Sequence, residues 1–230
     1  MRQVLRFERK YLLPQQEYRR HRARLEQLLP KDAHYGAEGY KIRSLYFDTL
    51  WDSDYVEKVE GIELRRKLRL RLYDPAGEVA FLEMKQKQGE HQLKRSLKLP
   101  KPDAQALCRG EYSVLLGYRS SFADECYTLL TMRGYRPKVI VEYIREAFTI
   151  PTNDTRITFD RDIRATEGSF NLFDPQLCLY PVMDQGQVVL EIKYNGFLVE
   201  YIRELAGSCD RAQTSASKYA MGRLASYGVV

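Results

Sequence analysis

The chain has 230 residues, of which 44% are hydrophobic and 30% are charged. This composition is typical of a soluble globular protein and excludes a largely disordered chain. The net charge of +6 favours an anionic partner, which leaves a nucleic acid, an acidic membrane or a polyphosphorylated molecule.

The sequence also lacks recognisable targeting and redox patterns. The N-terminal segment MRQVLRFERKY contains no apolar run of a signal peptide, and no run of about 18 apolar residues occurs anywhere. The four cysteines are far apart and show no metal-binding spacing, which indicates reduced thiols. We therefore expect a cytoplasmic protein without an integral membrane segment.

The first elements alternate between strands and helices. Charged and apolar side chains alternate in residues 4–11, which predicts a strand with Lys10 on its charged face. A helix is predicted over residues 14–29, because Pro14 can open it and Pro30 ends it. A second strand over residues 41–48 and a short helix near residues 52–59 follow.

The most regular pattern is IELRRKLRLRLY at residues 62–73. Its alternation predicts a strand with a leucine face and a cationic face that carries Arg69 and Arg71. A solvated edge strand is the simple alternative for one such segment. The next two predicted strands, residues 79–87 and 91–99, carry similar charged faces.

These neighbouring faces favour an anionic ligand. Glu83 and Lys85 share one face of the strand over residues 79–87, and Lys94 lies on the charged face of the strand over residues 91–99. Like charges directly opposite each other in a sheet repel. An anion that neutralises them therefore explains the pattern better than an ordinary wet surface.

The second half of the chain repeats this organisation after a helical stretch. Residues 103–132 have helical spacing of apolar side chains and are expected to cover the sheet. Strands are predicted over residues 137–149, 155–162 and 187–194, and two helices near residues 198–206 and 217–227 end the chain. Glu142 and Arg145 are three residues apart and would point to opposite faces of a regular strand. A bulge would therefore be needed to turn Arg145 toward the other charged side chains.

The charged faces constrain the fold. Burying one unpaired ion costs several kcal/mol, whereas total stability is only about 5–15 kcal/mol. A hydrated lumen that holds a polyanion satisfies this constraint, and carboxylates among the cations suggest Mg²⁺ or Mn²⁺ bound to phosphate. We predict one α+β domain over residues 1–230, a closed antiparallel β-barrel with helices packed on its outside.

Eight short motifs resemble, in the same order, the catalytic domain of the vacuolar transporter chaperone family, which belongs to the triphosphate tunnel metalloenzymes. The resemblance spans nearly the whole chain. The motifs are FERKY (7–11), SLYFDT (44–49), LRLRLY (68–73), LEMK (82–85), VEYIREAF (141–148), TRITFD (155–160), LEIKY (190–194) and SASKYAMG (215–222).

The resemblance implies a basic tunnel in which the γ-phosphate of ATP is transferred to a polyphosphate chain, with Mn²⁺, or Mg²⁺, as cofactor. Glu191 matches the metal-binding glutamate, and Glu83 and Glu142 are further candidate ligands. Strand parity adds Lys94, and Ser217 at a helix start adds phosphate donors. The matching phosphate positions are Lys10, Arg69, Arg71, Lys85, Arg145, Arg156, Lys193 and Lys218. Six of them are predicted to act in catalysis, namely Arg69, Arg71, Lys85, Arg145, Arg156 and Lys193.

Two alternatives to a polymerase stay open, a tripolyphosphatase of the same fold and a non-catalytic polyphosphate-binding module. Only Glu8-Arg9-Lys10 remains of the ExExK pattern that opens the related CYTH branch, which disfavours a cyclase or thiamine-triphosphatase. Nucleic-acid binding is also disfavoured, because it should place stacking aromatics among exposed cations. The expected ligands are ATP or another triphosphate and polyphosphate, and a separately encoded membrane protein stays open as a partner.

Overall fold

The computed structural model of the protein describes residues 6–30, 38–88, 91–207 and 214–226. Contacts divide the chain into two compact units. The first unit comprises Met1–Lys41, Tyr143–Ile163 and Met183–Ser217, and the second comprises Ile42–Glu142, Arg164–Val182 and Lys218–Val230. Each unit is therefore assembled from three separate segments, and the single domain over residues 1–230 stays a prediction.

The first unit is built on strands paired in the order β1-β9-β7-β6. The pairs β1–β9 and β9–β7 are antiparallel. Two of these strands, β6 and β7, continue into the second unit. The elements are β1 (Arg6–Pro14), α1 (Gln15–Leu28), β6 (Arg136–Ile150), η2 (Thr152–Asp154), β7 (Thr155–Thr166), β9 (Gln187–Asn195) and α5 (Glu200–Gly207).

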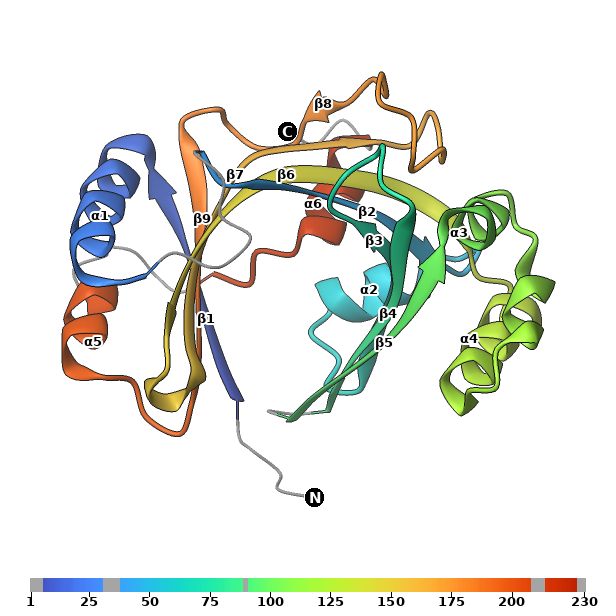
Figure 1. Cartoon of the computed structure of the whole chain (residues 1–230), viewed down its shortest axis with the longest axis horizontal. Helices are drawn as coiled ribbons and strands as arrows, with labels where there is room; N and C mark the ends of the chain where they lie inside the picture. Colours follow the sequence, from blue (N-terminus) through green and yellow to red (C-terminus); the bar gives the residue numbers. More distant parts are fainter. Residues whose placement is uncertain (1–5, 31–37, 89–90, 208–213, 227–230) are drawn as a thin grey trace. The chain divides into compact units, whose positions relative to one another are not determined.

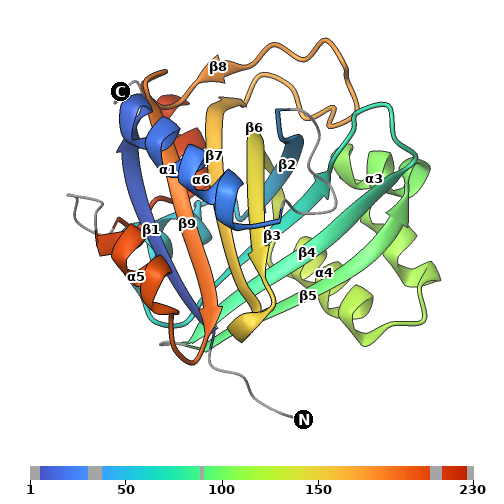
Figure 2. The same cartoon turned by 60° about the vertical axis from the view of Figure 1, so that its left-hand side comes forward.

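Helices α1 and α5 lie against the strands β1 and β9, as Figure 2 shows. Their apolar side chains pack on the apolar face of the sheet. Leu25 of α1 and Ile202 of α5 join Leu13, Phe159 and Leu190 in one buried cluster. The residues that alternate with these apolar ones carry the charged side chains on the other face of the strands, as the alternation in the sequence predicted.

The second unit is built on strands paired in the order β6-β2-β3-β4-β5, and β8 pairs with β7. The helical stretch predicted over residues 103–132 is confirmed as α3, η1 and α4. The elements are β2 (Tyr40–Asp48), α2 (Ser53–Val59), β3 (Arg65–Leu72), β4 (Val79–Gln88), β5 (His91–Pro100), α3 (Lys101–Cys108), η1 (Tyr112–Gly117), α4 (Ser121–Met132), β8 (Tyr180–Pro181) and α6 (Lys218–Ser226).

Strand β3 shows why the alternating pattern forms a sheet. Leu68, Leu70 and Leu72 are fully buried, whereas the cations between them are only half-buried. The leucines pack under α3 and α4, which lie over β4 and β5 in Figure 1. Burial of about 25 cal/mol per Å² of apolar surface stabilises this arrangement.

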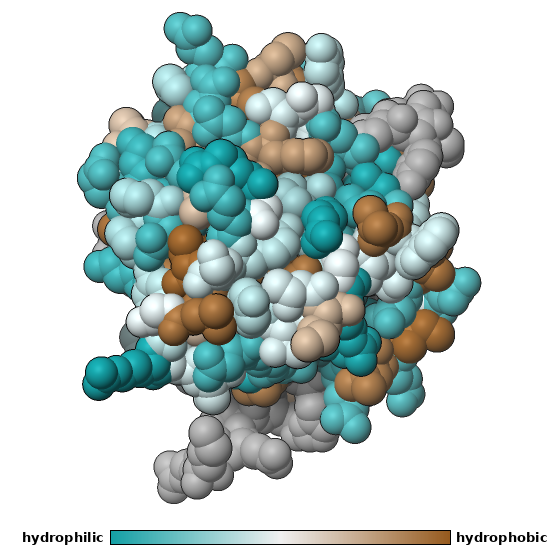
Figure 3. Space-filling view, turned by 90° about the vertical axis from the view of Figure 1, so that its right-hand side faces the viewer, coloured by the Kyte–Doolittle hydropathy of each residue, from teal (hydrophilic) through white to brown (hydrophobic). Residues whose placement is uncertain are grey.

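The outer side of this helical cover is mostly hydrophilic. Figure 3 looks onto the side of α3 and α4, where hydrophobic residues form small separate groups among hydrophilic ones. Exposed Leu116 and Met132 belong to this cover. Single exposed apolar side chains are normal on protein surfaces and need no partner.

The predicted closed barrel is wrong, although the antiparallel α+β architecture is correct. The strand-pairing path starts at β1 and ends at β5, and these strands do not pair with each other within the described residues. Closure would need a ladder between the two terminal strands, with a matching stagger. Alternation of polar and apolar residues fixes which face a side chain takes, but it carries no information about that ladder.

Among the described helices, none combines the length and the apolar character needed to cross a membrane.

Candidate functional site

The residues predicted to bind phosphate or metal fall into two groups, one in each unit. We call these groups the first-unit cluster and the second-unit cluster. The first-unit cluster contains Lys10, Arg145, Arg156, Glu191, Lys193 and Ser217. The second-unit cluster contains Arg69, Arg71, Glu83, Lys85 and Lys94, and two further predicted residues of this unit, Glu142 of β6 and Lys218 of α6, lie on other elements.

Strand register brings the first-unit cluster together. Lys10 of β1 lies opposite Glu191 of β9, and the neighbouring row joins Glu8 to Lys193. On the other side of β9, Arg156 of β7 lies opposite Lys193. Directly opposite residues point to the same face of a sheet. Acidic and basic side chains from three strands are therefore interleaved on one face.

Lys10 keeps its positive charge on this face. Its Nζ atom is 2.7 Å from Glu8 Oε1 and donates to the carbonyl oxygen of Ala216 at 3.2 Å. Burial alone would lower the pKa of Lys10, but Glu191 and Glu8 raise it above its usual value. The contact with Ala216 also brings the segment that contains buried Ser217 next to Lys10.

Arg145 pairs with Asp160, which lies on the same face of β7 as Arg156. Its Nε and Nη2 atoms donate to the two carboxylate oxygens of Asp160 at 2.6 and 2.7 Å. Asp160 is fully buried, and Arg145 is only 8% exposed. Burial lowers the pKa of Arg145, but Asp160, Tyr143 and Glu191 together raise it well above its usual value, so the guanidinium stays charged. This bidentate pair fixes the plane of the guanidinium.

Two carboxylates of the first-unit cluster share a lysine. Lys193 Nζ contacts Glu191 and lies 3.8 Å from Glu8 Oε2. Mg²⁺ and Mn²⁺ typically bind one or two protein carboxylates and take further oxygens from phosphate. Glu191 and Glu8 therefore fit a metal that arrives together with a phosphate ligand. Within the described ranges, no group of three His, Cys, Asp or Glu residues could hold a metal ion.

Arg156 is oriented by a tyrosine. Its Nη2 atom donates to the hydroxyl oxygen of Tyr40 at 2.8 Å. The preceding Gly39 has a φ of +94°, and a Cβ atom there would lie 2.5 Å from the carbonyl oxygen of Arg145. The segment at residues 39–40 therefore contacts two of the predicted phosphate-binding arginines, and only glycine allows its close approach.

The second-unit cluster surrounds one buried carboxylate with cations. Glu83 is 2% exposed, and Arg69 donates to its Oε2 atom from Nε at 3.0 Å and from Nη2 at 2.8 Å. Arg71 Nη2 and Lys94 Nζ each lie 2.7 Å from Glu83 Oε1. Burial would raise the pKa of Glu83, but Arg69, Arg71 and Lys94 together lower it to about 2. Glu83 is therefore ionised at any neutral pH.

Three lysines lie side by side in the next row of this face. Lys67 of β3 lies opposite Lys85 of β4, which lies opposite Lys94 of β5. The positions that the sequence predicted as neighbouring like charges are thus direct cross-strand neighbours. Such pairs repel each other, and the ion pair of Lys94 with Glu83 offsets part of this repulsion.

Glu142 has a partner outside the predicted site. Arg43 is 2% exposed, and its Nε atom donates to Glu142 Oε2 at 2.6 Å. Arg43 Nη1 also donates to the carbonyl oxygens of Leu172 and Asp174, at 3.2 and 2.5 Å. This network ties the segment around residues 172–174 to the sheet, which gives Glu142 a structural contact. Its role as a metal ligand stays a prediction.

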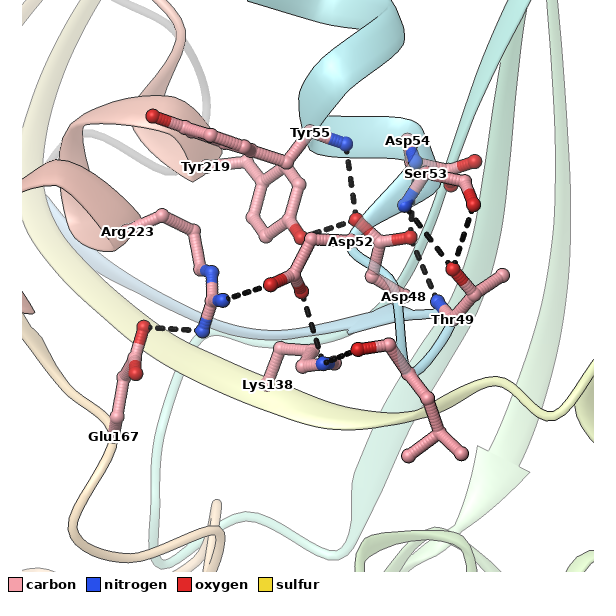
Figure 4. Close-up of polar contacts among 11 residues, drawn as sticks. Asp48, Thr49, Asp52, Ser53, Asp54, Tyr55, Lys138, Glu167, Tyr219 and Arg223 are labelled. Atoms are coloured by element: carbon pink, nitrogen blue, oxygen red, sulfur yellow. Dashed lines mark hydrogen bonds and ion pairs between the residues drawn. The ribbon is translucent and has the colours of Figure 1, made fainter.

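Lys218 is the first residue of α6, which is anchored by buried Asp48 (Figure 4). The hydroxyl of Tyr219 donates to Asp48 Oδ2 at 2.5 Å. The same carboxylate accepts the backbone N–H groups of Thr49, Asp54 and Tyr55 at 2.7, 2.9 and 3.0 Å. Asp48 thus caps the N-terminus of α2 and fixes the start of α6 at one point.

A second anchor holds α6 one turn later. Arg223 donates from Nη2 to Asp52 Oδ2 at 2.5 Å and from Nη1 to Glu167 Oε1 at 2.7 Å (Figure 4). Lys138 of β6 lies 2.9 Å from the other oxygen of Asp52. Gly222 lets this turn approach the sheet, because a Cβ atom there would lie 3.0 Å from a methyl group of Val141.

Asp54 makes this region sensitive to pH. It is 2% exposed and accepts a hydrogen bond from the hydroxyl of Tyr135 at 2.7 Å. Burial raises its pKa to about 8, and Asp48 adds to the effect while the Tyr135 bond opposes it. The folded state therefore keeps a proton on Asp54 at neutral pH, whereas the unfolded chain loses it near pH 4.

We expect Asp54→Asn to flatten the pH dependence of stability. Because the folded pKa is raised, the contribution of Asp54 is complete below about pH 4 and declines as pH rises toward 8, by up to about 1.4 kcal/mol per pH unit. Asparagine keeps an acceptor for Tyr135 and does not titrate. Melting temperatures at pH 5 and pH 8 should differ more for the natural protein than for the variant. An equal difference in both proteins would show that Asp54 is already ionised when folded.

The sequence predictions missed several residues that complete these clusters. Asp160 shares the parity of Arg156, which was the available signal, but nothing local showed that it would pair with Arg145. Tyr46 and Asp48 belong to the motif SLYFDT, which was the available signal, but no role in the site was assigned to them. Tyr40 precedes the strand predicted over residues 41–48. Each of these residues acquires its role through a contact made across strands or between distant segments.

These observations define an α+β protein with an open antiparallel sheet. Its charged faces carry clusters of basic and acidic side chains, one in each unit. The model of the VTC domain matches residues 5–227. The chain belongs to the VTC domain family, as the resemblance of its motifs predicted.

One solved structure agrees with this chain at the level of the fold. A crystal structure of a candidate adenylate cyclase from Bacillus halodurans has a TM-score of 0.54 and 15% identity, and the similarity covers 93% of this chain and 94% of that chain. A conserved hypothetical protein from Pyrococcus furiosus has a TM-score of 0.38 and 7% identity over 89% of this chain and 85% of that chain. No curated protein sequence matches significantly.

Proposed function

We propose that the protein acts on triphosphates by phosphoryl transfer and that its reaction is the synthesis of polyphosphate from ATP. Membership of the VTC domain family supports this proposal. The observation that carries it is the second-unit cluster, where Arg69, Arg71 and Lys94 share a single buried carboxylate and Lys85 lies directly opposite Lys94. Guanidinium and ammonium groups match phosphate oxygens in charge and geometry.

The charged side chains of these clusters suit the requirements of phosphoryl transfer. Its transition state needs positioning and neutralisation of oxygen charge more than covalent help from the protein. In the first-unit cluster, Lys10, Arg145 and Arg156 would bind phosphate oxygens. Glu191, with Glu8 beside it, would hold Mn²⁺ or Mg²⁺, which withdraws charge from phosphate when bound. In the second unit, the arginines of β3 would bind phosphate groups and Lys218 would add a cation.

One assay separates the proposed reaction from its alternatives. Purified protein is incubated with ATP and Mn²⁺, and both long-chain polyphosphate and released phosphate are measured. We expect polymer. Release of phosphate alone would identify a hydrolase of triphosphates, and tight binding of tripolyphosphate without turnover would identify a binding module.

We expect Glu191→Gln to lower Mn²⁺-dependent turnover more than about 100-fold, since it removes the charge of the proposed metal ligand. Affinity for tripolyphosphate without metal should change by less than about threefold, because the neighbouring cations remain. Glu200→Gln, which alters an exposed ion pair with Arg203 in the same unit, is the matched control. Full activity of the Glu191 variant would exclude this metal assignment.

A further inference from the structure

Arg69 is held from both sides by neighbouring strands. On β4, Glu83 accepts two hydrogen bonds from its guanidinium. On β2, the residue directly opposite Arg69 is Tyr46, whose hydroxyl oxygen accepts from Arg69 Nη1 at 3.2 Å. The guanidinium carbon also lies 5.9 Å from the centre of the Tyr46 ring. Three nitrogen atoms with partners on two strands leave the guanidinium little freedom to rotate.

Tyr46 is itself fixed by a second aromatic ring. It is 5% exposed and stacks on Tyr219, with ring centres 5.2 Å apart and planes inclined by 27°. Tyr219 is 1% exposed and donates its hydroxyl proton to Asp48 (Figure 4). Because Asp48 also accepts three backbone N–H groups, it cannot turn without breaking the cap of α2.

These contacts form a continuous path from a helix cap to a phosphate-binding side chain. We propose that Tyr46 is a positioning residue that sets the guanidinium of Arg69 for binding a phosphate group, and that Tyr219 and Asp48 hold Tyr46 in place. The inference rests on the proposed function, because it gives Tyr46 a role only if Arg69 binds phosphate. Tyr46 acts through Arg69 and does not itself contact the phosphate.

A double-mutant cycle on tripolyphosphate affinity tests this inference. Titration calorimetry without metal is performed on Tyr46→Phe, Arg69→Ala and the combined variant. We expect Tyr46→Phe to weaken binding about tenfold, which corresponds to about 1.4 kcal/mol. Arg69→Ala should weaken it about 100-fold, and adding Tyr46→Phe to it should change nothing further. Phenylalanine keeps the stack on Tyr219, so melting temperatures should stay close to that of the natural protein.

The outcomes of this cycle are distinguishable. If Tyr46→Phe weakens binding by the same factor with and without Arg69, Tyr46 acts independently of Arg69 and the inference is overturned. If Tyr46→Phe leaves affinity unchanged while Arg69→Ala weakens it, the inference also fails but the phosphate site stands. If Arg69→Ala has no effect, the proposed phosphate site itself fails, and the inference fails with it.

The more distant part of the path has its own variant and control. Tyr219→Phe removes the hydrogen bond to Asp48 and should weaken tripolyphosphate binding about threefold, again only when Arg69 is present. Glu167→Gln weakens the other anchor of α6, at Arg223, and should lower the melting temperature without weakening binding. Equal losses of affinity in both variants would show that general loosening of α6 is responsible, and would remove Tyr219 from the path.

Discussion

Asp160→Asn is expected to lower the free energy of unfolding by about 3–5 kcal/mol, the usual effect of removing one partner of a buried ion pair. Asp160 is fully buried and satisfies two nitrogen atoms of Arg145, which is almost as deeply buried. Asparagine has nearly the same shape as aspartate, so the substitution removes the negative charge with little change in packing. The remaining guanidinium would be left in a protein interior with one fewer counter-charge. Urea unfolding at pH 7 measures the difference.

The control for this variant is a solvent-exposed ion pair of the same protein. Arg109 and Glu111 form an exposed pair, with distances of 2.8 and 3.0 Å, and Glu111→Gln should leave the unfolding midpoint almost unchanged. A loss below about 1 kcal/mol in the Asp160 variant would contradict the expectation. It would mean that Glu191, whose Oε2 atom lies 3.9 Å from Arg145 Nη2, compensates for the missing charge.

Glu83→Gln is expected to destabilise the protein by a similar amount, about 3–5 kcal/mol, and to increase its response to polyanions. The change removes the one carboxylate that Arg69, Arg71 and Lys94 share. Their mutual repulsion then opposes folding, and a bound polyanion can replace the lost charge. Tripolyphosphate should therefore raise the melting temperature of the variant by more than that of the natural protein.

The pH dependence of the Glu83 variant provides a second check. The folded pKa of Glu83, about 2, lies below its value in the unfolded chain, near 4.3. Its stabilising contribution is therefore complete above about pH 5 and declines as pH falls toward 2. The stability difference between the natural protein and the variant should shrink over the same interval.

Glu125→Gln is a matched control for this experiment, because Glu125 pairs with Arg95 of β5 outside the cluster. It should not change the effect of tripolyphosphate. If instead Glu83→Gln weakened Mn²⁺ binding and left the response to polyanions unchanged, Glu83 would be a metal ligand, as the sequence analysis predicted, rather than a counter-charge for the cations.

The sequence determined the local structure and the chemical character of this protein. In residues 62–73 a two-residue period predicted β3, its buried leucines and its cationic face, because strand geometry sends alternate side chains to opposite sides. The order of short motifs also predicted the VTC domain family.

Only the tertiary structure decided how the strands and charges are partnered. The ends of the pairing path at β1 and β5, the pair of Arg145 with Asp160, and the bond of Tyr219 to Asp48 depend on which segments meet. Tyr219 and Asp48 are separated by 171 residues. The period of a sequence fixes the face on which a side chain lies, whereas its partner is chosen by register and chain topology, which no local pattern encodes.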